Sequence, residues 1–360
     1  MLRSIQRGRD QGACDMRQVA DAASARDAVE ELLAEYGVRD ILAVTPTASE
    51  TDRTWLVATR RGGLVVKRSP HGSAAPRTQA GLLALAARDA SLPLPRLLTS
   101  ATTGAALSAD GTAYVTTLCP GRPLEEATLT EDLAAALARH QAALMDVLAD
   151  ADADALGVPD ANAWSLDAVV EYAPLVDAHA PTGTADVLRA VIDGYRARVL
   201  PVRGDLPAQV IHADLNLSNV LVADGGEVSG IIDFGDAVRA PRAYDVAVAA
   251  CYLALACGAL DHPVVRRYLQ QAAIRCRLGA LEVSLLRTLA LCRLAIVILL
   301  GRESARRAPD RAAYVLRYDR LAERLLASVG GVDGLDGVDG LDGANGLDGV
   351  DARAAEGTIA

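Results

Sequence analysis

The sequence contains almost no lysine. Lys67 is the single lysine among 36 lysine and arginine residues, so arginine carries nearly all of the positive charge. Arginine is a broad planar fork, whereas lysine is a compact point charge on a thin stem. We therefore expect Lys67 to mark a position that accepts only the point charge. A chance surface lysine is the alternative that composition alone leaves open.

Cysteine is also scarce, and it lacks any metal-binding pattern. None of the six cysteines belongs to a CxxC pair or to another metal-site spacing. We expect them to be reduced, small apolar residues of a cytoplasmic protein. The cysteines lie at positions 14, 119, 251, 257, 276 and 292.

Signals for targeting, membranes and nucleic acids are weak. Residues 1–10 are charged and contain no apolar run, so no secretory signal is expected. The most apolar stretch, residues 285–301, is interrupted by Arg287 and Arg293, which favours a buried core helix over a membrane span. The formal net charge of −10 argues against a nucleic-acid partner and favours a cationic or zwitterionic ligand.

The pattern of apolar residues predicts two regions of different architecture. The first region combines strands with helices, and from about residue 124 helices predominate, interrupted by a short β-rich island at residues 210–234. Pro120 and Gly121 break the chain between the two regions. The first region is expected to contain helices over residues 26–36 and 79–87 and strands over residues 41–44, 54–59, 64–67 and 112–118.

The two ends of the sequence differ from its body. Residues 1–25 are polar and rich in alanine, without a clear period, and are expected to be flexible. Past Gly330, Val-Asp-Gly and Leu-Asp-Gly triplets repeat through Gly349. This spacing of three does not match calcium-binding repeats, so residues 329–360 are expected to form a disordered, solvated tail.

Residues 210–235 carry the candidate chemistry. They contain H-x-D-x-x-x-x-N at His212, Asp214 and Asn219, followed by D-F-G beginning at Asp233. Phosphoryl transfer needs a carboxylate that orients and deprotonates the acceptor hydroxyl, and ligands that hold Mg²⁺ on the phosphates of ATP or GTP. We predict Asp214 as the base and Asn219 and Asp233 as Mg²⁺ ligands, because amide and carboxylate oxygens suit that ion. We expect His212 to brace the loop without transferring a proton.

The spacing of these motifs predicts how they meet. Asp224-Gly225-Gly226 is a turn signal between two β-branched runs, so a hairpin is expected. Asn219 lies seven residues before Gly226 and Asp233 lies seven after it. The two metal ligands are therefore predicted to be cross-strand neighbours at the open end of the hairpin.

Lys67 fits the same chemistry. It ends the run Val65-Val66-Lys67, which matches the strand that carries the phosphate-binding lysine of kinases. Upstream, residues 46–52 stand where protein kinases place a glycine-rich loop, but they contain no glycine. We expect backbone N–H groups and the hydroxyls of Ser49 and Thr51 to hold the phosphates there.

Together these residues resemble the aminoglycoside phosphotransferase/choline kinase family, the small-molecule branch of the protein-kinase fold, and most closely hydroxylysine kinase and its bacterial relatives. The resemblance spans roughly residues 26 to 328. Further motifs that carry it are Ser49-Glu50-Thr51-Asp52-Arg53, Gln79, Pro93–Leu97, Trp164-Ser165-Leu166 and Tyr244-Asp245-Val246-Ala247.

The resemblance implies an α+β, two-lobed fold. An N-lobe with a small antiparallel sheet is expected over residues 26–118, and a mainly helical C-lobe over residues 119–328. The backbone of the hinge strand, at Thr116 and Leu118, would bind the nucleobase. Gln79 stands where protein kinases offer a glutamate to the lysine, and Asp52 and Glu50 are the alternative partners.

The acceptor is the least determined part of this reading. Asp236, next to D-F-G, is a candidate to meet an amine, and for Asp245 a turn or helix-cap role is at least as well supported as a direct one. Arg239, Arg242 and Arg293 are candidates to meet a carboxylate, which favours 5-hydroxylysine or a similar hydroxylated amino acid. Aminoglycoside, homoserine and choline or ethanolamine kinases remain alternatives, and so does a pseudokinase that binds nucleotide without turnover.

Overall fold

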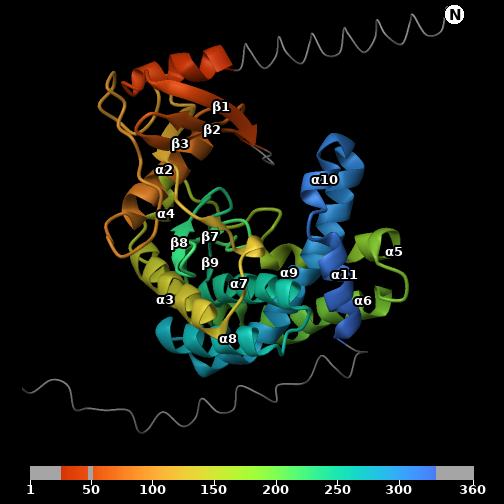
Figure 1. The fold of residues 1–360 in the computed structure, drawn as a ribbon. Helices are drawn as coiled ribbons and strands as arrows, with labels where there is room; N and C mark the ends of the chain where they lie inside the picture. Colours follow the sequence, from red (N-terminus) through yellow and green to blue (C-terminus); the bar gives the residue numbers. More distant parts are fainter. Residues whose placement is uncertain (1–25, 48–51, 330–360) are drawn as a thin grey trace, which may run out of the picture.

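The structure is a computed structural model that describes residues 26–47 and 52–329. Two lobes face each other across a central region, with the smaller lobe in red and orange and the larger, mainly helical lobe in yellow to blue (Figure 1). The expected α+β, two-lobed fold is confirmed. The expectations for residues 1–25 and 330–360, and those for Ser49, Glu50 and Thr51, lie outside the described residues.

The N-lobe is built on one antiparallel sheet with the strand order β1-β2-β3-β4. A helix over residues 26–35 packs on one face of this sheet, where Leu33, Trp55, Val57 and Val66 form a small core. The strands are β1 (Ile41–Thr47), β2 (Arg53–Thr59), β3 (Gly62–Arg68) and β4 (Ala113–Thr117).

The alternation of side chains along β3 determines where Lys67 points. Val66 is fully buried in the N-lobe core. Successive side chains of a strand lie on opposite faces, so Lys67 lies on the other face of the sheet. Helix α2 (Ala74–Ala86) follows and begins five residues earlier than predicted. Pro76 is accommodated in its first turn, because the N–H groups of that turn have no partner within the helix.

The C-lobe contains the larger of the two cores. Its helices are the α-helices α3 (Glu131–Leu148), α4 (Ala153–Leu156), α5 (Val176–His179), α6 (Ala185–Gly194), α7 (Arg242–Cys257), α8 (Pro263–Arg275), α9 (Ala280–Arg307), α10 (Ala312–Val315) and α11 (Asp319–Ser328), the 3-10 helices η1 (Leu124–Glu126), η2 (Leu166–Leu175), η4 (Leu200–Asp205) and η5 (Pro309–Arg311), and the π-helix η3 (Tyr195–Val199). Its short strands are β5 (Arg122–Pro123), β6 (Ala208–Ile211), β7 (Val220–Val222), β8 (Val228–Ile231) and β9 (Val238–Pro241).

Helix α9 runs through the centre of this lobe. Among the described residues it is the one helix long and apolar enough to span a membrane, and 78% of its most apolar window is buried inside the protein. Tight packing on nearly all sides explains why the helix is apolar around its whole circumference. The expected buried core helix is therefore confirmed.

The hairpin that carries the D-F-G motif differs from the prediction by one residue. Ala223 and Glu227 face each other, so the turn pivots on Gly225 rather than on Gly226. Ser229 is an extra residue on β8, because Val222 pairs with Val228 while Leu221 pairs with Gly230. The predicted pairing of Asn219 with Asp233 is wrong, since Asn219 accepts a hydrogen bond from the N–H of Ile232.

The bulged residue contacts the hinge. The hydroxyl of Ser229 donates a 2.6 Å hydrogen bond to the carbonyl oxygen of Pro120. A β-bulge turns a side chain in a new direction and leaves one residue of the strand without a pairing partner. The bulged residue thereby ties the hairpin to the segment that joins the two lobes.

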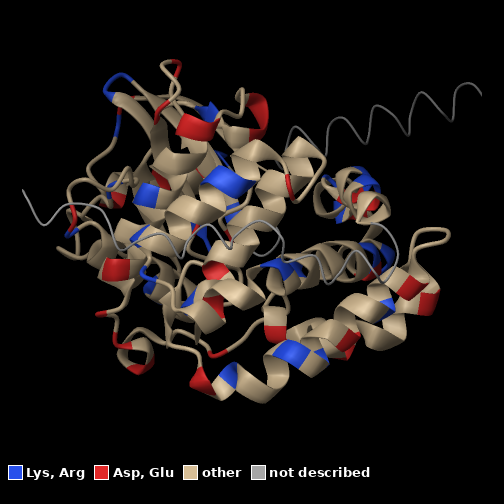
Figure 2. Ribbon diagram, turned by 90° about the horizontal axis from the view of Figure 1, so that it is seen from below, with Lys and Arg blue, Asp and Glu red and all other residues tan. Residues whose placement is uncertain are grey.

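Charged residues of both signs occur together on the side of the molecule that is seen from below (Figure 2). Seen from below, basic and acidic residues are interspersed along the helices, and neither sign forms a continuous face in this view (Figure 2). Opposite charges placed in this way neutralise each other at short range.

Candidate active site

A cavity of about 270 Å³ lies between the lobes. Its volume is near the lower end of the ~300–1,000 Å³ range of small-molecule sites. Lys67 lines it from the N-lobe. The sequence-predicted residues that line it from the C-lobe are Asp214, Asn219, Asp233, Asp236 and Arg293.

The loop that carries Asp214 is held in an uncommon conformation. Ala213 has φ +63° and Asp233 has φ +70°, a left-handed region that side chains other than glycine seldom adopt. The N–H of Ala213 donates a 2.7 Å hydrogen bond to Oδ1 of Asp245, which is fully buried on α7. A strained backbone conformation persists only where surrounding contacts hold it in place. The hydrogen bond to Asp245 is one of these contacts.

His212 connects this loop to the strand of the D-F-G motif. Its Nδ1 accepts a hydrogen bond from the N–H of Asp214, and its Nε2 therefore donates to the carbonyl oxygen of Ile232 at 3.1 Å. The ring is fully buried and lies 4.9 Å from the ring of Phe234. Burial lowers the pKa of His212, which favours the neutral imidazole that this pattern requires.

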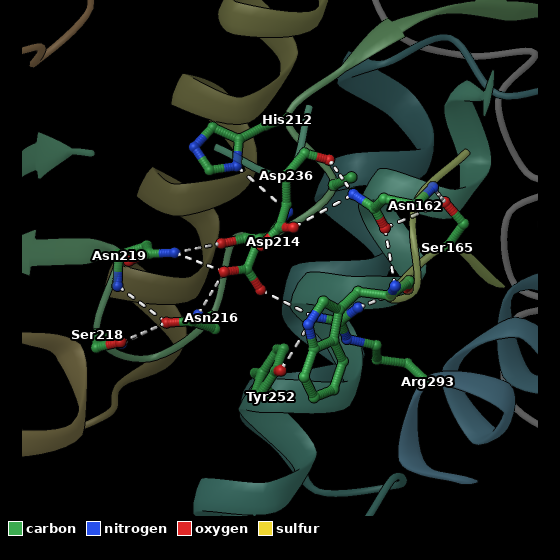
Figure 3. Close-up of polar contacts among 12 residues, drawn as sticks. Asn162, Ser165, His212, Asp214, Asn216, Ser218, Asn219, Asp236, Tyr252 and Arg293 are labelled. Carbon is green, nitrogen blue, oxygen red and sulfur yellow. Dashed lines mark hydrogen bonds and ion pairs between the residues drawn. The ribbon is translucent and has the colours of Figure 1, made fainter. Parts of the chain in front are cut away.

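Both carboxylate oxygens of Asp214 are engaged. Oδ2 accepts hydrogen bonds from the side-chain amides of Asn216 at 2.7 Å and Asn219 at 2.8 Å, while Oδ1 accepts one from Nη2 of Arg293 at 2.8 Å (Figure 3). Burial raises the pKa of Asp214 to about 7, although the Arg293 guanidinium opposes this shift. Oδ1 accepts only one of these bonds and has a second lone pair, so the carboxylate can still accept a hydrogen bond from a hydroxyl.

Asn219 and Asp233 offer oxygen atoms suited to Mg²⁺. Both hydrogen bonds of the Asn219 side chain use its amide nitrogen, which leaves its amide oxygen for a cation. Asp233 uses Oδ1 for Lys67 and for the N–H of Gly235, which leaves Oδ2. Mg²⁺ binds few protein oxygens and completes its shell with water and phosphate. The donor set therefore fits this ion.

Lys67 pairs with Asp233 rather than with α2. Its Nζ lies 2.6 Å from Oδ1 of Asp233, and only 15% of the lysine side chain is exposed. Burial alone would lower the pKa of Lys67, but the Asp233 carboxylate outweighs it and the pKa lies above its ordinary value. Gln79 is buried and bonds instead to Asp52, at 3.2 Å, and to the hydroxyl of Tyr114.

Asp236 lines the cavity together with Asp214, and the close-up draws the two residues near each other (Figure 3). Its Oδ1 accepts a 3.2 Å hydrogen bond from the amide of Asn162, which also donates to the backbone oxygen of Asp236. Burial raises its pKa, although Arg293 opposes the shift. The site thus contains a second carboxylate close to the candidate base.

Some sequence-predicted residues lie away from the cavity. Arg239 forms an exposed ion pair with Asp160, and Arg242 forms a double hydrogen bond with Glu282, so the structure brings neither of them to the site. Thr116 and Leu118 lie on and just after β4 and are also absent from the cavity lining. The N–H of Leu118 is bonded to the carbonyl oxygen of Gly63 at 2.9 Å.

The structure adds residues that the motifs did not single out for the cavity. Four aromatic side chains line it, although phenylalanine, tryptophan and tyrosine make up only 3% of the chain. Arg317 lines it as well, between α10 and α11. Helical periodicity gives no signal for such residues, because they converge from distant segments only in the folded chain. The four aromatic residues are Trp164, Tyr252, Tyr314 and Tyr318.

Comparison with known proteins identifies a family. Residues 43–282 match the model described as "Phosphotransferase enzyme family". Two curated relatives match locally. The homoserine kinase of Neisseria meningitidis serogroup B is 38% identical over 91 residues, which is 25% of this chain. The homoserine kinase of Gluconacetobacter diazotrophicus is 48% identical over 64 residues, which is 17% of this chain. These alignments cover 27% and 20% of the two relatives, so the chain spans about a quarter or less of their length.

Solved structures share the fold. The GDP and kanamycin complex of APH(2")-IIIa has a TM-score of 0.61 at 19% identity, covering 84% of this chain and 99% of that one. The amicoumacin kinase hAmiN, in complex with AMP-PNP, Ca²⁺ and Ami, has a TM-score of 0.56 at 16% identity, covering 78% and 87%. At this identity the likeness establishes the kinase-like fold alone.

Proposed function

The chain belongs to the phosphotransferase enzyme family, whose model spans two thirds of it, and we propose that this small-molecule phosphotransferase acts on a hydroxylated amino acid. One observation carries the proposal. A candidate base, two candidate metal ligands and a candidate phosphate-binding lysine converge on one cavity that also contains acidic and basic groups. A zwitterionic acceptor matches such a mixed lining.

The proposed reaction transfers the γ-phosphoryl group of a nucleoside triphosphate. The acceptor oxygen forms a bond to the γ-phosphorus, the bond from that phosphorus to the β–γ bridging oxygen breaks, and the nucleoside diphosphate leaves. The hydroxyl proton passes to the carboxylate of Asp214. Because such transition states need little covalent help, positioning and electrostatic stabilisation supply most of the catalysis.

Each residue then has a defined task. Asp214 orients the hydroxyl, and Asn216, Asn219 and Arg293 fix the position of its carboxylate through the bonds described above. Asn219 and Asp233 would hold Mg²⁺, which neutralises phosphate charge when bound. Lys67 would contact the phosphates from the N-lobe.

The acceptor class follows from the charges next to the base. Asp236 can receive an ammonium group near the position of the reacting hydroxyl. An aminoglycoside carries several amines and no carboxylate, so it would use acidic groups and offer no anion to Arg317, which has no acidic partner among the described residues. Of the rival amine acceptors, choline and ethanolamine also lack a carboxylate.

Two hydroxylated amino acids are the leading candidates. The sequence motifs resemble hydroxylysine kinase, which supports 5-hydroxylysine. The local matches to two homoserine kinases support homoserine, which has the same amino, carboxylate and hydroxyl groups on a shorter chain. The two acceptors differ in length and in the second amine of hydroxylysine.

An acceptor panel tests the proposal. Formation of nucleoside diphosphate is measured with homoserine, 5-hydroxylysine, kanamycin and ethanolamine under equal conditions, with MgATP and MgGTP as donors. We expect one of the two amino acids to give the highest kcat/KM. Far more efficient turnover of kanamycin or ethanolamine would contradict the amino-acid acceptor. Nucleotide binding without turnover of any acceptor in the panel would instead support a pseudokinase.

A further inference from the structure

Arg317 lies in the cavity on a segment far from the D-F-G motif in sequence. It stands between α10 and α11, and its side chain is exposed. Its guanidinium carbon lies 4.2 Å from the ring centroid of Tyr314 and 4.8 Å from that of Tyr318. Nη1 donates a 3.0 Å hydrogen bond to the carbonyl oxygen of Tyr314. An exposed arginine is thus held in one orientation at the wall of the cavity.

The other aromatic pair of the cavity holds the other arginine. The guanidinium of Arg293 lies 5.2 Å from the ring centroid of Trp164 and 5.4 Å from that of Tyr252. Aromatic faces attract cations, and an aromatic cavity of this kind could accept a quaternary ammonium ligand. Here the rings already contact arginines of the chain itself, so they orient positive charge for an anion.

The charges of the cavity are unequally paired. Lys67 is paired with Asp233, and Arg293 is paired with Asp214. Within the described part of the chain, Arg317 forms no ion pair with an acidic side chain, since its contacts are with the two tyrosines. Arg317 is therefore the positively charged residue of the cavity whose charge a ligand can still neutralise.

A second unsatisfied group lies beside it. Tyr318 is only 5% exposed, and within the described residues its hydroxyl makes no hydrogen bond of normal geometry, although the side chains of Ser218 and Arg317 lie near enough to counteract the rise that burial causes in its pKa. A buried hydroxyl without a partner is costly. A carboxylate held by Arg317 could accept a hydrogen bond from this hydroxyl and remove that cost.

We propose that Arg317, assisted by the hydroxyl of Tyr318, binds the carboxylate of the acceptor. The guanidinium fork suits a carboxylate because two parallel N–H groups can bond its two oxygens. With an ammonium group near Asp236 and the carboxylate at Arg317, the amino acid is held by its charged groups of both signs while its hydroxyl faces Asp214. This assignment rests on the proposed amino-acid acceptor and makes Arg317 a specificity-determining residue.

The test compares each acceptor with its decarboxylated analogue. Homoserine is paired with 3-amino-1-propanol, and 5-hydroxylysine with 1,5-diaminopentan-2-ol. We expect Arg317→Gln to lower kcat/KM about 10- to 100-fold for the amino acid, mainly through KM, because a charge-assisted pair is lost. The decarboxylated analogue should be used equally well by wild type and variant. Tyr318→Phe should show the same selectivity with a smaller loss of about 2- to 10-fold.

Controls separate this role from others. Arg320→Gln removes the same charge from an exposed position on α11 and should change neither acceptor's kinetics. Arg317→Lys should lose part of the preference, since it keeps the charge and loses the fork. Equal losses of Arg317→Gln for the amino acid and its analogue, or a loss confined to the KM of the nucleotide, would overturn the assignment and point to a structural or phosphate-binding role.

The outcome also distinguishes the two proposals. If wild type prefers the amino acid over its decarboxylated analogue and Arg317→Gln leaves this preference unchanged, the result contradicts the role of Arg317 but not the proposed function. Absence of turnover with every amino acid contradicts the proposed function. In that case, calorimetric titration of homoserine into the complex of the protein with a non-hydrolysable nucleotide still tests Arg317. If homoserine binds wild type and Arg317→Gln equally well, or binds neither, the result counts against the role of Arg317.

Discussion

The guanidinium of Arg293 lies 2.8 Å from Oδ1 of Asp214, and only 2% and 14% of the two side chains are exposed. The pair joins α9 to a loop 79 residues earlier in the chain. Arg293 also donates to the backbone oxygen of Trp164 and to the hydroxyl of Tyr252. The arginine that sequence reasoning offered for the acceptor's carboxylate is thus already bonded to the candidate base, and we infer that it positions this base.

Arg293→Met is expected to weaken both folding and activity. The substitution leaves the buried carboxylate of Asp214 without its counter-charge, which typically costs about 3–5 kcal/mol. Urea unfolding should show this loss in the free energy of unfolding, and kcat should fall with it. Arg307→Met is the matched control, because this arginine of the same helix is 71% exposed and its buried partner Glu303 keeps its pair with Arg306, so the variant should stay within about 0.5 kcal/mol of wild type. Equal stability and activity of the two variants would refute the positioning role.

Lys67→Arg is expected to impair turnover although the charge is conserved. Lys67 lies 2.6 Å from Asp233 in a largely buried position, where the broader guanidinium would displace the carboxylate. We expect kcat/KM to fall at least about tenfold, equivalent to ~1.4 kcal/mol of transition-state stabilisation. Lys67→Met, which also removes the charge, should be worse. An arginine variant with wild-type kinetics would show that the scarcity of lysine has no bearing on this site.

Asn219→Ala is expected to raise the demand for Mg²⁺. It removes one of the two proposed oxygen ligands, so the Mg²⁺ concentration for half-maximal activity should rise about tenfold or more, a loss of ~1.4 kcal/mol. Asn162→Ala provides the comparison, because this amide bonds Asp236 and should change the KM of the acceptor instead. If the two variants respond alike to Mg²⁺, Asn219 is not a ligand of the metal.

The sequence predicts most of the local structure around the motifs. The strand that carries Lys67, the hairpin before D-F-G and the buried character of α9 all follow from short-range pattern. The register of the hairpin does not, because it includes a bulge at Ser229, whose hydroxyl bonds the carbonyl oxygen of Pro120 in the hinge. Such a contact joins residues 109 positions apart and leaves no periodic signal.

The residues that hold the site in place give no local sequence signal, for the same reason. The sequence leaves a cap or turn role and a direct role open for Asp245, whereas in the structure it bonds the N–H of Ala213 and the amide of Gln141. Arg317 carried no motif at all, and its position in the cavity results from the path of the chain after α9. Long-range packing decides both, and a single sequence encodes it only indirectly.

The most direct test of the account follows the phosphoryl group itself. Phosphorus NMR of a reaction with MgATP and homoserine or 5-hydroxylysine should show a new phosphate monoester with wild type. Asp214→Asn should form it about 10²–10⁴-fold more slowly, with nucleotide affinity nearly unchanged. Asp205→Asn, at an exposed aspartate of η4, should behave as wild type. A phosphorylated amino acid made at the wild-type rate by Asp214→Asn, or the absence of any such product with wild type, would contradict the central claim.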